Sequence, residues 1–195
     1  MKIAVFVSGR GTNLNAILNS PLCKDEIEVY FVVSDKANPP AFEIAQEHGI
    51  ITYSLSKKDK MNSFSFDELG KIFLDTGIEL IVLAGFLKLV PESFINLFEK
   101  KIINIHPALL PKYGGKGMYG MNVHKAVFES GDKISGATVH FVNPHYDEGS
   151  IIQSEIVDIS GAQNPEEVAA LVLKSEHTLL PKVVSKFKNG ELFNK

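Results

Sequence analysis

The sequence lacks the features that tie a protein to a disulfide framework, a membrane or a nucleic acid. It has one cysteine, Cys23, so no disulfide can form within the chain, and a reducing compartment such as the cytoplasm is expected. No apolar run approaches the roughly 20 residues that span a bilayer, and the apolar N-terminal stretch is too short for a signal peptide. The formal net charge of -3 provides no broad basic surface for nucleic acid or anionic lipid. We therefore expect a soluble cytoplasmic protein.

Length and composition fit one compact domain over residues 1–195. The chain is 45% hydrophobic and 22% charged, and no internal repeat or low-complexity linker interrupts it. Short apolar or β-branched runs alternate with helical patterns along its whole length. Strands are expected at 2–7, 27–35, 51–54, 78–85, 102–105, 136–142 and 151–157. Helices are expected at 14–18, 41–49, 66–74, 91–100, 123–130 and 165–187.

The strand composition predicts an α/β fold with a doubly wound, mostly parallel, Rossmann-like sheet. The runs at 29–33 and 80–84 are apolar on both faces, as expected for parallel strands that helices cover on each side. The last two strands are joined with less helix between them, which predicts a mixed C-terminal edge. Ligands of such sheets bind at the carboxyl ends of the strands, so the segments that follow the strands are the candidate sites.

The first candidate is the glycine-rich turn SGRGTN after the first strand. Gly11 allows a tight turn, while Thr12 and Asn13 are able to cap the next helix and offer further donors. The N-terminus of that helix would bind a phosphate well. A tight structural turn with a good N-cap is the alternative.

A dinucleotide-binding turn competes with the phosphate interpretation. Gly9 and Gly11 match the first two glycines of GxGxxG, and Asp35 ends the second strand where a ribose-binding acid is expected. However, Leu14 stands where the third small residue belongs. The P-loop pattern GxxxxGK[ST] is absent from the sequence.

The second candidate is NIHP, at the end of the strand at 102–105. Alternation along a strand directs Asn104 and His106 to the same side. An amide can hold a developing oxyanion, and an imidazole can donate to that oxygen or transfer a proton near neutral pH. Pro107 and Pro111 fix the backbone beyond them. A hydrogen-bonded histidine with a turn-forming asparagine is the structural alternative.

The third candidate is the loop NPHYDEG between the last two strands. A carboxylate in this loop can charge and orient a nearby imidazole. Asp147 is preferred because the loop narrows to a turn there, and Glu148 is the alternative. A solvated hairpin would explain the same composition.

Metal binding is not indicated, although four histidines lie in one half of the chain. None of them has the ligand spacing of HxxxH or HExxH. We interpret His140, on a buried-looking strand, as a hydrogen-bonded core histidine. The four are His106, His124, His140 and His145.

Taken together, five segments resemble the folate-dependent phosphoribosylglycinamide formyltransferase family. They are SGRGTNL, VLAGFLKLVP, NIHPALLPKYGGKGMYG, HFVNPHYDEGSII and KSEHTLLP, and the resemblance extends nearly from end to end. NIHP followed by LLPKY is the most specific part. The resemblance implies the formyltransferase fold, with nucleotide phosphate binding in the N-terminal half and folate binding and catalysis in the C-terminal half.

The resemblance also implies a role for particular positions. The implied catalytic residues are Asn104, His106 and Asp147. The implied contacts to the nucleotide phosphate and ribose are Gly11, Thr12, Asn13 and Glu176. The implied folate contacts are Asn62, Leu87, Lys88, Leu89, Val90, Asn104, Asn143 and Tyr146. Asn62 stands nearest to the place where an arginine is often used, and Gly114 stands where proline is common.

The resemblance implies transfer of a formyl group from 10-formyltetrahydrofolate, the cosubstrate, to the amine of glycinamide ribonucleotide, a step of purine biosynthesis. Asn104 and His106 would stabilise the oxyanion, while the charge of Asp147 would keep His106 protonated. No metal is expected, and the protein would be a monomer or a homodimer. Formyltetrahydrofolate deformylase and methionyl-tRNA formyltransferase are related alternatives. A dinucleotide-binding Rossmann protein is the alternative from another class.

Overall fold

The structure, a computed structural model, describes residues 1–55 and 63–192. Its strands form a seven-stranded, mostly parallel sheet in the order β3-β2-β1-β4-β5-β6-β7, so the predicted α/β fold class is confirmed. The chain forms two compact units, an N-terminal unit (1–103) and a C-terminal unit (104–195). Strand β5 (Ile102–His106) contains the boundary between them.

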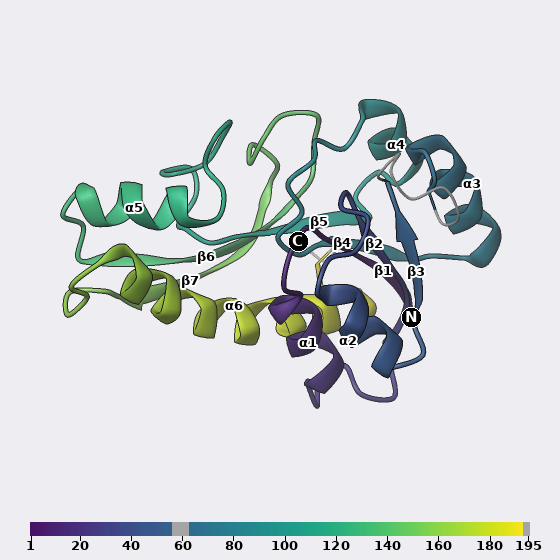
Figure 1. Ribbon diagram of the computed structural model, residues 1–195, viewed down its shortest axis with the longest axis horizontal. Coiled ribbons are helices and arrows are strands. Elements are labelled where there is room, and N and C mark those ends of the chain that lie inside the picture. Colours follow the sequence, from purple (N-terminus) through teal and green to yellow (C-terminus); the bar gives the residue numbers. More distant parts are fainter. Residues whose placement is uncertain (56–62, 193–195) are drawn as a thin grey trace. The chain divides into compact units, whose positions relative to one another are not determined.

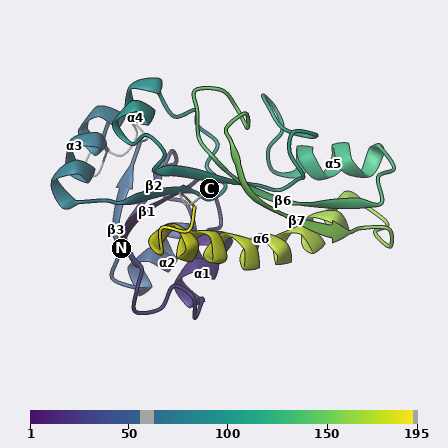
Figure 2. The same cartoon turned by 180° about the vertical axis from the view of Figure 1, so that it is seen from behind.

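The N-terminal unit is a parallel sheet with helices on both faces (Figure 1). Both views place α1 and α2 on one face and α3 and α4 on the other (Figure 2). Its strands are β1 (Lys2–Val7), β2 (Glu28–Ser34), β3 (Ile51–Ser54) and β4 (Leu80–Leu83). Its helices are α1 (Thr12–Asn19), α2 (Ala41–Glu47), α3 (Phe66–Thr76) and α4 (Glu92–Leu97).

Aromatic packing fills the core of this unit, because strands apolar on both sides must be covered on both sides. Phe6, Phe31, Phe73 and Phe94 are buried, and the ring of Phe73 lies 6.0 Å from that of Phe6 and 5.3 Å from that of Phe31. Helix α3 packs into this core, and the residues at its two ends define its limits. Ser65 forms a capping box at its start, and a left-handed glycine follows its end.

The C-terminal unit combines the end of β5 with an antiparallel pair of strands and two helices. The pair is β6 (Ile134–Phe141) and β7 (Ile151–Asp158), which is the mixed edge that the sequence predicted. The helices are α5 (Met121–Glu129) and α6 (Pro165–Lys188). Helix α6 runs along the β6–β7 pair in both views, and a buried cluster that includes Val127 and Val172 joins α5 to α6.

Local chemistry explains the limits of α6. Asn164 accepts a hydrogen bond from the backbone N–H of Glu167, and Pro165 occupies the first helical turn. Acidic side chains in the first turn and basic ones in the last turn interact favourably with the helix dipole. Among the helices of the described residues, none is both long enough and apolar enough to cross a membrane.

We predict that Gly11→Ala destabilises the protein by about 1–3 kcal/mol. Gly11 has a φ of 74°, and an added Cβ would lie 2.7 Å from the Cβ of Ala41, so the change brings both backbone strain and a clash. The free energy of unfolding in urea measures the effect. Gly9→Ala is the matched control, since its Cβ would enter open space, and it should change stability by less than about 0.5 kcal/mol. Equal effects of the two variants would contradict the prediction.

We predict that His124 makes the protein less stable as the pH falls from 6.5 to 4. The side chain on α5 is 6% exposed, and its Nδ1 has no hydrogen-bond partner among the described residues. Burial, with a smaller effect from the charge of His106, lowers the pKa of His124 from 6.5 to about 4. In that window the unfolded chain binds a proton that the folded protein does not, so stability is lost, by on the order of 3 kcal/mol.

Urea unfolding at a series of pH values measures this loss. His124→Gln should flatten the decline without abolishing it, because the pKa values of His106 and His177 are also lowered by burial. A decline unchanged in the His124→Gln variant would contradict the assignment.

Candidate active site

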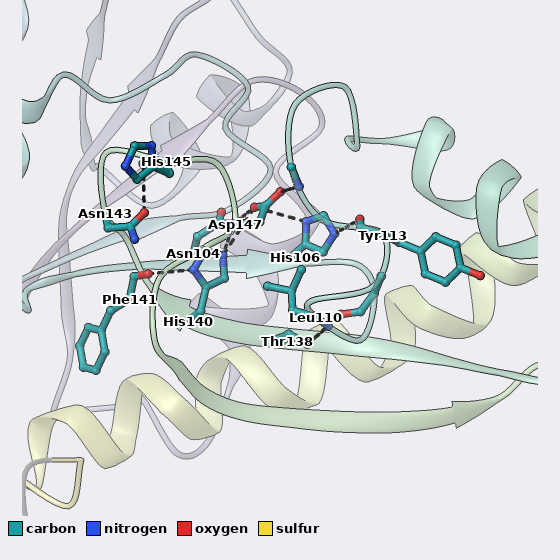
Figure 3. Close-up of polar contacts among 12 residues, drawn as sticks. Asn104, His106, Leu110, Tyr113, Thr138, His140, Phe141, Asn143, His145 and Asp147 are labelled. Carbon is teal, nitrogen blue, oxygen red and sulfur yellow. Dashed lines mark hydrogen bonds and ion pairs between the residues drawn. The ribbon is translucent and has the colours of Figure 1, made fainter.

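The candidate site in the C-terminal unit lies where β5 ends beside the loop that follows β6 (Figure 3). Asn104 and His106 lie two residues apart on β5, and both direct a nitrogen at Asp147 Oδ1, at 3.5 Å in each case. The structure therefore brings these two side chains together with Asp147. Their shared direction follows from the alternation of side chains along a strand.

His106 is buried between two acceptors. Its Nε2 lies 2.8 Å from the backbone oxygen of Tyr113, and a carbonyl oxygen only accepts, so Nε2 carries a hydrogen and donates it. Its Nδ1 faces Asp147 Oδ1. A proton on Nδ1 would therefore meet a carboxylate, and the ring is prepared to hold a positive charge during a reaction.

The backbone of Tyr113 is fixed in an unusual conformation. Its φ is 62°, in the left-handed region that non-glycine residues seldom adopt. Its hydroxyl donates to Asp132 at 2.7 Å, and Lys112 lies 2.6 Å from the same carboxylate oxygen. This anchoring holds the peptide whose carbonyl orients His106.

Asp147 is held by a separate contact from the glycine-rich loop. Its Oδ2 accepts the N–H of Gly115 at 2.9 Å, and its φ of 58° is also left-handed. Burial alone would raise the pKa of Asp147, but the contact with His140, the charge of His106 and the Gly115 N–H together lower it. Asp147 is thus a carboxylate at neutral pH.

Glu148, the alternative carboxylate, is exposed, whereas the side chain of Asp147 is only 12% exposed. The geometry therefore favours Asp147 as the group that acts on His106.

Burial and the neighbouring groups act in opposite directions on the pKa of His106. Burial lowers the pKa of His106 below its ordinary value, and the opposing effects of Asp147 and the Tyr113 carbonyl do not offset it. Burial therefore opposes the protonation of this ring that the charge of Asp147 was expected to maintain. Desolvation of the charged form is the physical reason, since the ring is only 3% exposed.

The sequence interpretation missed the contact that His140 makes with Asn104. It is buried and hydrogen-bonded, as expected of a core histidine, but its partner is Asn104, whose Nδ2 lies 3.0 Å from His140 Nε2. On the same face of β6, Thr138 donates to the carbonyl of Ala108 at 2.8 Å and so supports the turn after β5. Polar residues at alternate positions of an otherwise apolar strand were the available signal.

Other predicted residues of the C-terminal unit do not join this cluster of side chains. Asn143 accepts the N–H of His145 within its own loop, and Tyr146 is exposed. Glu176 lies on α6 and is 7% exposed.

The predicted phosphate turn lies in the N-terminal unit. Gly11 is the N-cap of α1, and its carbonyl accepts the N–H of Asn15 at 2.9 Å. Thr12 and Asn13 are the first two helical residues, so neither occupies the capping position. Within the described part of the chain, no side chain caps this helix end and no acidic residue lies in its first turn. The N-terminal N–H groups of α1 therefore have the character of an anion site.

The segment after β4 carries the residues expected to contact folate. Leu87, Lys88 and Leu89 are exposed, whereas Val90 is buried. The N–H of Leu87 donates to Ser8 Oγ at 2.8 Å, and Ser8 donates in turn to Asp35 at 2.5 Å.

Asp35 thus has a structural partner, which weakens the argument for a ribose-binding acid in a dinucleotide site.

Asn62 lies outside the described residues. Within 1–55 and 63–192, no group of three or more potential ligand side chains is placed to hold a metal ion.

Comparison with known proteins identifies relatives of this chain. The family model described as formyl transferase matches residues 1–184. A chloroplastic phosphoribosylglycinamide formyltransferase from Arabidopsis thaliana is 42% identical over 188 residues, which are 94% of this chain, and the chain spans 64% of that relative's length. The enzyme of the same name from Haemophilus influenzae is 36% identical over 98% of this chain and 89% of its own.

A solved structure supports the same assignment. The crystal structure of phosphoribosylglycinamide formyltransferase from Anaplasma phagocytophilum matches with a TM-score of 0.85 and 30% identity, and the match covers 97% of this chain and 87% of that one. The chain therefore belongs to the formyl transferase family and, within it, to the phosphoribosylglycinamide formyltransferases.

Proposed function

We propose that the protein transfers the formyl group of 10-formyltetrahydrofolate to the amine of glycinamide ribonucleotide, giving formylglycinamide ribonucleotide and tetrahydrofolate. The observation that carries this proposal is the convergence of Asn104, His106 and Asp147 at the end of β5. An amide donor, an imidazole and a carboxylate can together stabilise an oxyanion and transfer the proton in acyl transfer to an amine. Family membership supports the substrates, since the relatives carry the name of this reaction.

The reaction creates one anionic oxygen and one surplus proton. Attack of the amine on the formyl carbon forms the C–N bond and gives a tetrahedral intermediate that bears an oxyanion and an ammonium group. Asn104 donates an N–H to the oxyanion, which an amide does well in a water-poor site. The contact of Asn104 with Asp147 is 3.5 Å long, so this N–H makes only a weak hydrogen bond within the protein.

His106 receives the surplus proton in this proposal. The ring is mainly neutral beforehand because burial lowers its pKa, and negative charge that develops nearby raises that pKa. The resulting imidazolium faces Asp147 on one side and the Tyr113 carbonyl on the other. The proton then passes to the departing folate nitrogen as the C–N bond to folate breaks, which restores the neutral ring.

We assign the nucleotide phosphate to the N-terminal end of α1, at Gly11, Thr12 and Asn13, and the ribose to Glu176. Uncapped N–H groups and the positive end of the helix dipole favour a dianion.

We assign the folate to the segment Leu87 to Val90 with Asn143 and Tyr146. The exposure of Leu87 and Leu89, two large apolar side chains, is consistent with a ligand surface. Asn104 would contact the folate in addition to stabilising the oxyanion.

We further propose that the protein acts in the cytoplasm as a monomer or a homodimer. A single cysteine in the whole sequence fits a reducing compartment. The plant relative is described as chloroplastic, so fractionation of the native cells is the direct test.

We predict that Asp147→Asn and His106→Ala each lower kcat by on the order of a hundredfold or more. The first change removes the charge that stabilises the imidazolium, and the second removes the proton acceptor. The assay follows formation of formylglycinamide ribonucleotide from the two purified substrates. Glu148→Gln is the matched control and should retain activity, because its carboxylate is exposed.

Three results would count against the proposal. Full activity in both site variants would reject the site, and no turnover by concentrated wild-type protein would reject the reaction. Release of formate that does not depend on the nucleotide would instead favour a deformylase.

We predict that inorganic phosphate competes with glycinamide ribonucleotide, raising its apparent KM and leaving the maximal rate unchanged. The substrate analogue without its phosphate should lose at least about tenfold in kcat/KM, because it forgoes charge-assisted hydrogen bonds and the helix dipole. Steady-state kinetics with each substrate varied in turn measure both effects. If the analogue reacts as well as the nucleotide, the assignment of the nucleotide phosphate to the N-terminal end of α1 is wrong.

A further inference from the structure

The two ring nitrogens of His140 have different partners, and those partners fix its tautomer. Nδ1 lies 2.8 Å from the backbone oxygen of Phe141, which only accepts, so Nδ1 carries the hydrogen. In the neutral ring Nε2 is then an acceptor. It faces Asn104 Nδ2 at 3.0 Å, so the amide donates to the imidazole (Figure 3).

This contact determines which end of the Asn104 amide faces the reacting groups. An amide has a donor end and an acceptor end that are nearly equal in size, so packing alone does not distinguish them. His140 Nε2 takes one N–H of Asn104, and the second N–H is directed at Asp147 Oδ1. Both neighbours are acceptors, so the flipped amide would place an oxygen against each of them and lose both contacts.

The carbonyl that orients His140 is itself closely packed. A Cβ added to Gly149 would lie only 1.6 Å from the oxygen of Phe141 and 3.4 Å from Nδ1 of His140. Only a glycine permits the backbone to approach so closely at this point. His140 is also just 2% exposed, so water does not compete for either nitrogen.

We propose that His140 is a positioning residue for formyl transfer, which acts by holding one N–H of Asn104 so that the second, on the Asp147 side, is the donor available to the formyl oxygen. The inference rests on the proposed function. His140 does not touch the substrate in this role, because both of its nitrogens are occupied by protein groups. Its contribution is to the orientation of an oxyanion donor, and loss of such a donor costs on the order of a hundredfold in rate.

Two substitutions test the roles of the two ring nitrogens of His140 separately. In His140→Gln the terminal amide reaches the place of Nε2 and offers an oxygen to Asn104. In His140→Asn it reaches only the place of Nδ1, where it can donate to Phe141 but cannot accept from Asn104. We expect kcat to fall on the order of a hundredfold in His140→Asn and less than about tenfold in His140→Gln, with KM values changed less than about threefold.

A double-mutant cycle tests whether His140 acts through Asn104. In the Asn104→Ala background, His140→Asn should lower kcat by less than about twofold further, since the amide it orients is gone. Thermal unfolding of all variants checks that they remain folded. Equal loss of kcat in His140→Asn and His140→Gln would overturn the inference, and so would a full hundredfold effect of His140→Asn in the Asn104→Ala background.

NMR of the wild-type protein tests the tautomer of His140 without an activity assay. A variant is needed only to assign the His140 signals. The ¹⁵N chemical shifts of His140 report its tautomer, and we expect hydrogen on Nδ1 and a lone pair on Nε2. The opposite tautomer would overturn the inference even if the enzyme is active. Wild-type protein without formyl transfer would reject the proposed function instead, while the tautomer would still be readable.

Discussion

A single carboxylate oxygen, Asp147 Oδ1, is the point on which the site depends. Side-chain nitrogens of Asn104, His106 and His140 all face it, at 3.5, 3.5 and 3.6 Å. These separations exceed those of ordinary hydrogen bonds, so the oxygen organises the three groups by its charge more than by direct bonding. The firm contact of Asp147 is made by its other oxygen, with the Gly115 N–H. Asn104 thereby presents an N–H to this negative charge, and either imidazole would present one on gaining a proton.

The backbone around this carboxylate is strained at two places. Tyr113 and Asp147 both adopt left-handed conformations, and each contacts His106, one by its carbonyl and the other by its carboxylate. Such conformations typically cost on the order of 1 kcal/mol or more for residues with a Cβ. The surrounding contacts, Tyr113 with Asp132 and Asp147 with Gly115, offset that cost. Strain beside the proposed reacting groups is consistent with a preorganised site.

Much of this arrangement could be predicted from the sequence. Strands β1 and β3 have the expected limits, because their apolar runs are bounded by clear turn signals. The common direction of Asn104 and His106 followed from strand alternation alone. Helix α1 begins at Thr12, earlier than its apolar pattern suggested, because Gly11 can adopt the left-handed conformation that starts it.

Other features depend on contacts that composition does not encode. The Tyr113 carbonyl is a backbone group, and every residue has one, so nothing marked it as the partner of His106. The pairing of His140 with Asn104 depends on how two segments far apart in the sequence are aligned. The net effect of burial and charge on the pKa of His106 required the actual exposure of the ring.

The loop after β5 makes both of its contacts with the site within three residues. The Tyr113 carbonyl orients the imidazole, and the Gly115 N–H holds the carboxylate that faces the same ring. The spacing between these two peptides therefore sets the distance between a base and its counter-ion. Insertions and deletions are tolerated in most surface loops, but here a change of one residue between 113 and 115 would separate the pair without altering any functional side chain. Loop length, as much as residue identity, should be under constraint at this point of the chain.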